Sequence, residues 1–238
     1  MKKVAVLQSN YLPWKGYFDI INSVDLFIFY DDVQYTKNDW RNRNRIKTPG
    51  GIKWITVPVG TNLKRRIIDV ELKDNKWQNS HWGKIRWAYS KAPYFKEFRS
   101  FFEESYTKYQ WKYLYEVNRY FIINISKKFL GIKTEFADSR DYNPSGAGQE
   151  RLMSVLKKSG AKYYLSGPSA KKYINEDEFK KSGIMLEWKD YSDYPEYEQP
   201  FGKFEHRVSI IDVLFNIGPK ASYYIWGHRE EKAKTGGT

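Results

Sequence analysis

The chain begins with an apolar run that leads directly into a polar junction, and this pattern constrains the fold more than any other. Residues 4–7 are typical of a short buried strand, and residues 17–23 are typical of an amphipathic helix. Residues 25–30 predict a second strand. Because a strand–helix–strand unit lays its two strands in one sheet and in parallel, the chain is predicted to start a parallel α/β sheet.

The junction between the first strand and helix reads Gln-Ser-Asn-Tyr-Leu-Pro-Trp-Lys-Gly, residues 8–16. A turn needs only its proline and glycine. Gln8 and Asn10 add donors and acceptors, while Tyr11 and Trp14 add rings and Gly16 permits a close backbone approach. Since α/β proteins bind ligands at the carboxyl ends of their strands, we interpret the junction as substrate-binding. The alternative is an amide-capped turn with the tryptophan in the core.

Two adjacent carboxylates, Asp31 and Asp32, close the second predicted strand and are followed by Gln34. They could bind Mg²⁺, orient a sugar hydroxyl or act as a general base. Neighbouring strand residues face opposite ways, so only one carboxylate is expected to point into a site. We assign Asp32 as a candidate catalytic base and Asp31 and Gln34 to substrate binding. Helix capping or solvated charge is the alternative.

A basic run follows, Trp-Arg-Asn-Arg-Asn-Arg-Ile-Lys over residues 40–47. Forked guanidinium donors bind phosphate well, so the run predicts phosphate binding. In an extended segment the three arginines would share one face and the two asparagines the other. A solvated basic surface is the alternative. The substrate-binding candidates here are Trp40, Arg41, Asn42, Arg43, Asn44 and Arg45.

Three later patterns add candidates. His81 lies in a predicted helix and is a candidate acid–base residue, unless it only packs or caps. Ser166 and Gly167 close a predicted strand and open a helix, a geometry that favours phosphate. Asp212 and Asn216 lie four residues apart on one face of a predicted helix and are candidates for substrate binding. The alternative is a capped, half-buried helix without a binding role.

The remaining pattern predicts one α/β domain over residues 1–228, with a helical insertion at about 76–130 and a flexible tail at 229–238. Gly183 is the expected C-cap of one helix. The expected strands are residues 54–59, 67–72, 134–137, 163–166 and 185–188. The expected helices are residues 77–90, 94–105, 109–130, 149–159, 176–182, 209–216 and 220–226.

Composition excludes several kinds of chemistry. Without cysteine there are no disulfides, Cys-based zinc sites or thiol catalysis, and three histidines argue against an all-His metal site. We assign no metal ligand, and no motif indicates a cofactor. The net charge of +13 points to an anionic partner or simply to a lysine-rich surface. No apolar run is long enough to span a membrane or serve as a signal peptide, so a cytoplasmic protein is expected.

Together these motifs resemble the WbqC-like family, bacterial proteins found with polysaccharide and O-antigen biosynthesis genes. The matching segments are residues 8–18, 31–34, 40–47, 56–59, 92–95, 164–168 and 209–216, with Gly218 and Pro219. The family usually has Gln-Pro where this chain has Gln8-Ser9, and it tends to lack Arg207. The resemblance implies a transferase in O-antigen, lipopolysaccharide or surface-polysaccharide biosynthesis. Its implied substrate is a nucleotide-linked amino sugar, whose amine would receive an acyl or aminoacyl group from a donor.

The start of the chain also looks like nucleotidylyltransferases of the HIGH-motif class, through strand, Asn-x-x-Pro-x-x-Gly, helix and parallel strand. Tyr17 replaces their second motif histidine, which argues against adenylyl transfer but leaves nucleotide binding open. The expected fold is α/β, with a mostly parallel sheet of Rossmann-like or nucleotidylyltransferase-like type. Two other functions stay open: a polyanion-binding module, against which the lack of a DNA- or RNA-binding motif argues, and a non-catalytic scaffold.

Overall fold

The computed structural model describes the backbone of residues 1–235 and the side chains of residues 1–231, and a parallel five-stranded sheet organises it. The strands are β1 (Lys3–Leu7), β2 (Leu26–Phe29), β5 (Glu135–Asp138), β6 (Tyr163–Ser166) and β7 (Met185–Trp188). Their spatial order is β5-β2-β1-β6-β7. Numbered along the chain this is 3-2-1-4-5, an order found in doubly wound sheets. The expected α/β fold with a mostly parallel sheet is confirmed.

The central strands β1 and β2 form because their apolar runs are buried on both faces. β1 lies between β2 and β6, with Val4 opposite both Leu26 and Tyr164. Successive residues of a strand point to opposite sides, so Val4 faces one layer of helices and Ala5 the other. A parallel sheet covered on both faces requires such continuous apolar strands.

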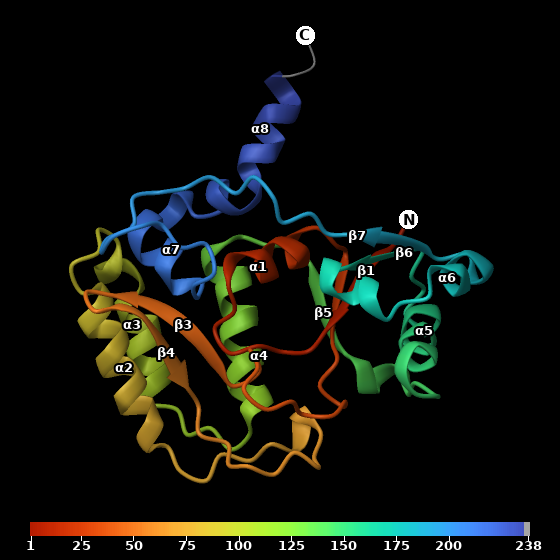
Figure 1. The fold of residues 1–238 in the computed structure, drawn as a ribbon, viewed down its shortest axis with the longest axis horizontal. Helices are drawn as coiled ribbons and strands as arrows, with labels where there is room; N and C mark the ends of the chain where they lie inside the picture. Colours follow the sequence, from red (N-terminus) through yellow and green to blue (C-terminus); the bar gives the residue numbers. More distant parts are fainter. Residues whose placement is uncertain (236–238) are drawn as a thin grey trace.

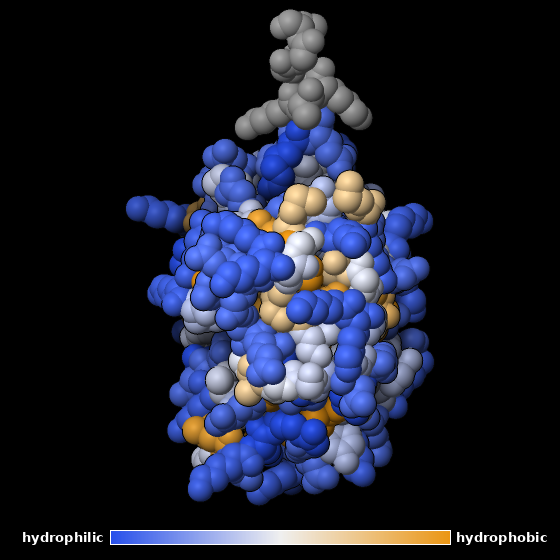
Figure 2. Space-filling view, turned by 90° about the vertical axis from the view of Figure 1, so that its right-hand side faces the viewer, coloured by the Kyte–Doolittle hydropathy of each residue, from blue (hydrophilic) through white to orange (hydrophobic). Residues whose placement is uncertain are grey.

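Two helix layers cover this sheet (Figure 1). On one face lie α1 (Lys15–Asn22) and α4 (Leu114–Asn124), which bury the larger core together with Ala5 and Phe27. On the other face lie α5 (Gly148–Lys158) and α6 (Glu176–Ser182). Figure 2 looks onto the side of the molecule where α5 and α6 lie, and hydrophilic side chains predominate there. Both helices are therefore amphipathic, with one side in the core and the other in water.

The ends of α6 illustrate how local sequence sets these helices. Asn175 caps its start, accepting a hydrogen bond from the Asp177 amide at 3.0 Å. Gly183 ends it with a positive φ of 71°, a conformation that glycine adopts without strain. The expected C-cap is thus confirmed.

The segment between β2 and β5 contains a hairpin ahead of the helices expected at about 76–130. It holds α2 (Lys76–Tyr89), α3 (Phe95–Thr107) and α4, but also an antiparallel hairpin of β3 (Arg43–Thr48) and β4 (Gly51–Thr56) beside α2 (Figure 1). The expected strand over residues 67–72 is wrong. A 3-10 turn, Ile67–Asp69, forms instead, because the amides of Ile67 and Ile68 donate to the carbonyls of Val33 and Asp31 and close over the end of β2.

A long irregular segment, residues 189–210, crosses from β7 to α7 (Ile211–Ile217), and we call it the strap (Figure 1). Two buried carboxylates anchor it. Asp19 of α1 accepts from Lys189 Nζ at 2.7 Å and Tyr194 Oη at 2.6 Å. Asp212 of α7 accepts from Tyr197 Oη and Gln199 Nε2, both at 2.7 Å. These bonds hold an otherwise unstructured segment against the helical layer.

The chain ends in α8 (His228–Thr235), which projects away from the sheet (Figure 1). The structure gives a helix where the sequence analysis expects a flexible tail from residue 229, and Arg229 ties its start to Asp19 at 2.5 Å. Residues 236–238 of that expected tail lie outside the described residues. The division into a single domain over residues 1–228 stays a prediction.

Candidate substrate-binding cleft

A cavity of about 1220 Å³ opens at the carboxyl edge of the sheet, above β1 and β6. These are the strands between which the order of connection reverses, the position where open α/β sheets bind their ligands. Residues from the junction after β1, the loop before β3, the start of α5, the segment after β6 and the strap line it. They include Gln8, Asn10, Trp14, Tyr17, Tyr30, Trp40, Arg41, Gly148, Gln149, Ser166, Gly167, Tyr173, Tyr191, Tyr194, His206 and Arg207.

Arg41 is the cation fixed most firmly in this cleft. Its Nη2 donates to Gln8 Oε1 at 2.6 Å and its Nη1 to Asn10 Oδ1 at 3.1 Å, while Asp39 lies 3.5 Å away. Its Nε is buried and has no hydrogen-bond partner among the described residues. With both amide oxygens engaged, the NH₂ groups of Gln8 and Asn10 remain available as donors. Two amides therefore orient one guanidinium, and the three side chains together form a donor-rich surface.

Aromatic rings form a wall beside this donor surface. The Trp14 ring meets Tyr191 edge-on at 5.2 Å and Tyr194 at 6.0 Å between centroids. Gly16 makes this arrangement possible, because a Cβ on it would lie 2.3 Å from Trp14 Cζ2. A smaller cavity of about 280 Å³ adjoins the main one and shares four of its lining residues: Asn10, Trp14, Trp40 and Arg207.

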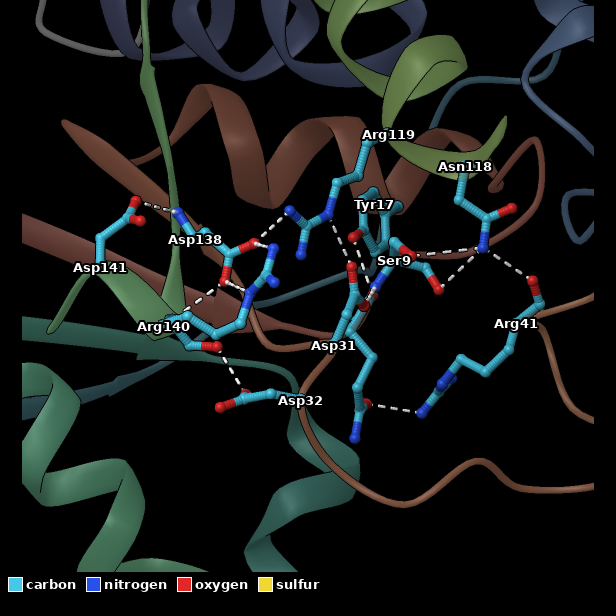
Figure 3. A network of polar contacts seen from close by, with 12 residues as sticks. Ser9, Tyr17, Asp31, Asp32, Arg41, Asn118, Arg119, Asp138, Arg140 and Asp141 are labelled. Carbon is cyan, nitrogen blue, oxygen red and sulfur yellow. Dashed lines mark hydrogen bonds and ion pairs between the residues drawn. The ribbon is translucent and has the colours of Figure 1, made fainter. Parts of the chain in front are cut away.

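A buried ionic network supports the junction from below (Figure 3). Asp31 accepts from the Ser9 amide at 2.7 Å and from Arg119 Nε at 2.8 Å. Asn118, the preceding residue of α4, donates to the carbonyls of Ser9 at 3.3 Å and Arg41 at 2.8 Å. Asp31 thus positions the junction from behind the cleft and does not line it.

The same network makes part of the stability acid-sensitive through Asp138. Burial alone would raise the pKa of Asp138, but hydrogen bonds from Arg140 and Arg119 outweigh it and lower the pKa to about 2. Because the folded-state pKa lies below the unfolded value, this contribution is complete above about pH 4 and is lost as pH falls towards 2. We expect Asp138→Asn to remove about 2 kcal/mol of acid-dependent stability, measured by urea unfolding between pH 5 and pH 2. An unchanged acid slope in the variant would contradict this assignment.

The structure brings part of the predicted site together. The predicted residues that line the cleft are Gln8, Asn10, Trp14, Trp40, Arg41, Ser166 and Gly167. Those that support its lining from behind are Tyr11, Gly16, Asp31 and Asn44, whereas Asn42 bonds to the Val57 carbonyl outside the cleft. Those that lie away from the main cleft are Asp32, Gln34, His81, Arg43, Arg45, Asp212 and Asn216.

Neither predicted catalytic residue reaches the cleft. Asp32 accepts from Ser139 Oγ at 2.6 Å and forms an ion pair with Arg151, so its carboxylate joins the end of β2 to the turn after β5 and to α5. His81 is 2% exposed, and its two ring nitrogens contact Tyr11 Oη at 2.9 Å and the Thr56 carbonyl at 3.1 Å. Burial lowers the pKa of His81 to about 3. We therefore carry neither residue forward as an acid or base.

The basic run divides between two places. Arg43 and Arg45 do alternate with the buried Asn44 along β3, as an extended segment should. They turn to exposed tryptophans, however: the Arg43 guanidinium lies 4.2 Å from the Trp54 ring centroid, and Arg45 lies 6.0 Å from Trp40. The three arginines therefore do not form one clamp.

The asparagines of this run satisfy backbone groups. Asn44 donates to the carbonyl of Leu12 at 2.7 Å, and Leu12 itself has a positive φ of 41°. Asn42 donates to the Val57 carbonyl at 2.9 Å. Gln34 is exposed, and its backbone forms an isolated antiparallel β-bridge with Arg66. Asn44 thus fixes the tight backbone of the junction from the hairpin side.

The predicted pair on α7 belongs to the strap anchor. Asp212 also accepts from Tyr89 Oη at 2.9 Å, and Asn216 donates to the Asp212 carbonyl at 2.9 Å. Both residues are buried, and burial raises the pKa of Asp212. Their shared helix face is therefore a core face.

Sequence reasoning missed the contribution of the strap and of α5. Tyr191, Tyr194 and His206 line the cleft from a segment with no periodic pattern, and Gly148 and Gln149 line it from the first turn of α5. The only local signals are the recurring tyrosines of the strap and the Gly-x-Gly before α5. Neither pattern by itself reveals which sheet edge the residues face.

Neither a clustered metal site nor a membrane-spanning helix is present among the described residues. Over the described residues, no group of three or more His, Asp or Glu side chains gathers to hold a metal ion. In that same part of the chain, every helix is too short or too polar to cross a membrane.

Comparisons with known proteins give one family. A model of the WbqC-like protein family matches residues 8–224. The chain is also similar to a protein of Mycobacterium tuberculosis (strain ATCC 25618 / H37Rv) named "Uncharacterized protein Rv1507c". The two are 44% identical over 227 residues, which cover 94% of this chain and 98% of that relative. No solved structure matches this chain.

Proposed function

The chain belongs to the WbqC-like protein family, and from this membership and its sheet-edge cleft we propose that it is a transferase acting on a nucleotide-linked amino sugar. The reaction would add an acyl or aminoacyl group to the sugar amine during O-antigen or other surface-polysaccharide biosynthesis. We also propose that this reaction takes place in the cytoplasm.

The observation that carries the proposal is the fixed guanidinium of Arg41. A nucleotide sugar contains a diphosphate, and a planar guanidinium binds phosphate oxygens through paired hydrogen bonds. Gln8 and Asn10 already hold Arg41 in place, so binding would order few additional side chains. Each Nη of Arg41 carries two N–H groups and uses one of them on an amide oxygen, which leaves further donors for an anionic ligand.

The size and walls of the cleft also suit such a ligand. A volume of about 1220 Å³ exceeds the roughly 300–1,000 Å³ of ordinary small-molecule sites, so an extended ligand fits. Trp14 and Tyr191 offer rings on which a base can stack. The adjoining cavity of about 280 Å³ gives a separate space for the sugar.

The test is calorimetric titration with dTDP-amino sugars, comparing Arg41→Met with Arg43→Met. Removing the charged hydrogen bonds of Arg41 is expected to weaken binding about 10- to 100-fold. Arg41→Lys should restore only part of the affinity, because an ammonium lacks the guanidinium fork. Arg43→Met is the matched control, since Arg43 stacks on Trp54 away from the cleft, and it should bind like the wild type.

Two results would count against the proposal. Failure of the wild type to bind any nucleotide sugar would reject it. Equal loss in both arginine variants would show that general positive charge, and not the cleft, attracts the ligand.

A second candidate function has its own observation. Trp40 and Trp54 are 40% and 42% exposed, their centroids are 5.4 Å apart, and Arg43 lies over one ring. Cationic, exposed aromatic surfaces bind single-stranded nucleic acid by stacking. Anisotropy with a fluorescent oligonucleotide would favour this function if affinity falls steeply with salt and Arg43→Met weakens it more than Arg41→Met.

A further inference from the structure

The proposed transfer needs a proton acceptor, because a sugar amine is an ammonium ion near neutral pH and cannot attack until it loses a proton. Asp32 and His81 are both engaged elsewhere. Asp193 and His206 both line the cleft and could accept a proton, and His206 is the one whose side chain offers both a donor and an acceptor position.

The His206 ring is packed against a neighbouring ring but makes no hydrogen bond to a described residue. It packs edge-on against Phe204, with centroids 4.6 Å apart. Its Nδ1 is buried without a hydrogen-bond partner among the described residues. His81 differs, since both of its nitrogens have partners. Because Nδ1 is enclosed, the ring nitrogen that can exchange a proton with a ligand in the cleft is Nε2, to which no described residue is hydrogen-bonded.

A buried ammonium lies behind this histidine. Lys15, the first residue of α1, is 3% exposed, and its Nζ lies 4.8 Å from the centroid of Tyr194, 5.6 Å from Tyr197 and 5.7 Å from Phe204. Its hydrogen bond is to the Pro195 carbonyl at 3.4 Å. Aromatic faces stabilise a cation without neutralising it. Burial lowers the pKa of Lys15 to about 8, so at pH 7 most of the side chain is the ammonium ion and presents a positive charge to its surroundings.

The charges facing His206 come from two elements. Burial and then the positive charge of Lys15 on α1 lower the pKa of His206, while Glu196 and Glu205 of the strap act in the opposite direction. The Glu205 carboxylate also forms an ion pair with Arg45, whose Nη2 lies 3.7 Å from Glu205 Oε1. The lowered pKa means that the imidazole is neutral, and so able to accept a proton, at pH 7.

We propose that His206 is the proton acceptor of the cleft and that Lys15 is a positioning residue supplying a positive charge near it. This inference rests on the proposed function. One proton passes from the sugar ammonium to the imidazole. The amine lone pair then forms an N–C bond with the carbonyl carbon of a thioester or ester donor, and the C–S or C–O bond breaks. The leaving group takes that electron pair and the second amine proton, and the imidazolium releases its proton to solvent.

The first test follows the histidines by NMR, since the chain has three and labelled histidine gives one resonance set for each. His206→Gln assigns its signal. We expect the pKa of His206 to rise in Lys15→Met, where the repelling charge is gone, and to stay near the wild-type value in Lys15→Arg. Circular dichroism of both Lys15 variants checks that they are folded. An unmoved pKa in a folded Lys15→Met would overturn the role of Lys15.

The second test separates binding from proton transfer. His206→Gln should bind the dTDP-amino sugar within about twofold of the wild type but transfer at least about 100-fold more slowly at pH 7. The acidic limb of the pH–rate profile should move to higher pH in Lys15→Met. Wild-type transfer by His206→Gln would overturn the inference and leave the proposed function standing. Absence of nucleotide-sugar binding by the wild type would reject both.

Discussion

Replacing Asp31 by Ala is expected to lower the free energy of unfolding by about 3–5 kcal/mol, the range for removing one partner of a buried ion pair. Asp31 is fully buried and accepts from Arg119 Nε and the Ser9 amide. Without it, Arg119 keeps Asp138 as a partner, but its Nε and the Ser9 amide lose their acceptor (Figure 3). Because Ser9 lies inside the junction, the affinity of the cleft for a nucleotide-linked amino sugar should fall as well.

Urea unfolding of wild type and variant measures this loss, which corresponds to a fall in melting temperature of roughly 6–20 °C for a chain of this size. Asp69→Ala is the control, since it breaks a surface pair with Arg66 whose side chains are 57% and 44% exposed. That change should cost less than about 1 kcal/mol. Equal losses in the two variants would show that the buried network has no special weight.

Gly16→Ala is the second large prediction, and its sign depends on Trp14. A Cβ at residue 16 would lie 2.3 Å from Trp14 Cζ2, so the indole must leave the cleft wall. Overpacking of this kind costs about 1–3 kcal/mol, and here it also removes the ring from its contacts with Tyr191 and Tyr194. Ligand affinity should therefore fall together with stability.

The same substitution made in a Trp14→Ala background should have the opposite effect. Residue 16 lies in α1, where alanine is favoured over glycine by up to about 1 kcal/mol once nothing obstructs it. The double-mutant cycle should then give a coupling free energy of about 2–4 kcal/mol. Additive effects would show that the Trp14 ring does not need the space above Gly16.

The parallel sheet could be predicted because its signals are local. Val4 to Leu7 and the later apolar runs are short, continuous and bounded by polar residues, as strands buried on both faces must be. The α5 and α6 helices likewise showed amphipathic periods. The order of the strands was not local information, since it depends on which layer each crossover helix covers.

The first strand of the hairpin was missed for a physical reason, whereas the second, Gly51–Thr56, overlaps the strand expected over residues 54–59. Arg43, Asn44 and Arg45 look like a loop, yet they form β3 because Asn44 satisfies the carbonyls of the junction while the arginines stack on tryptophans. Tertiary contacts thus override the polar composition. The same long-range effect explains the error over Ile67–Asp69, whose amides pair with the end of β2 and not with a neighbouring strand.

The sequence predicted the part of the candidate site that directly follows β1 and β6. It did not predict the part that the strap contributes. Gln8, Asn10 and Ser166 lie at carboxyl ends of adjacent parallel strands, so topology alone brings them together. His206 reaches the cleft only because Asp19 and Asp212 hold the strap in place. Nothing in the local sequence of the strap encodes that position.

The distance along the chain between the two sides of the cleft has a consequence for synthesis. Trp14 emerges from the ribosome long before His206, and at 5–20 residues per second the interval is roughly 10–40 s. During that time the junction has no strap beside it, so the Trp14 ring and the ammonium of Lys15 lack the tyrosines that enclose them in the finished protein. The site is therefore among the last parts of the protein to be completed, and a nascent chain released before the strap has been made could not bind what the full-length chain binds.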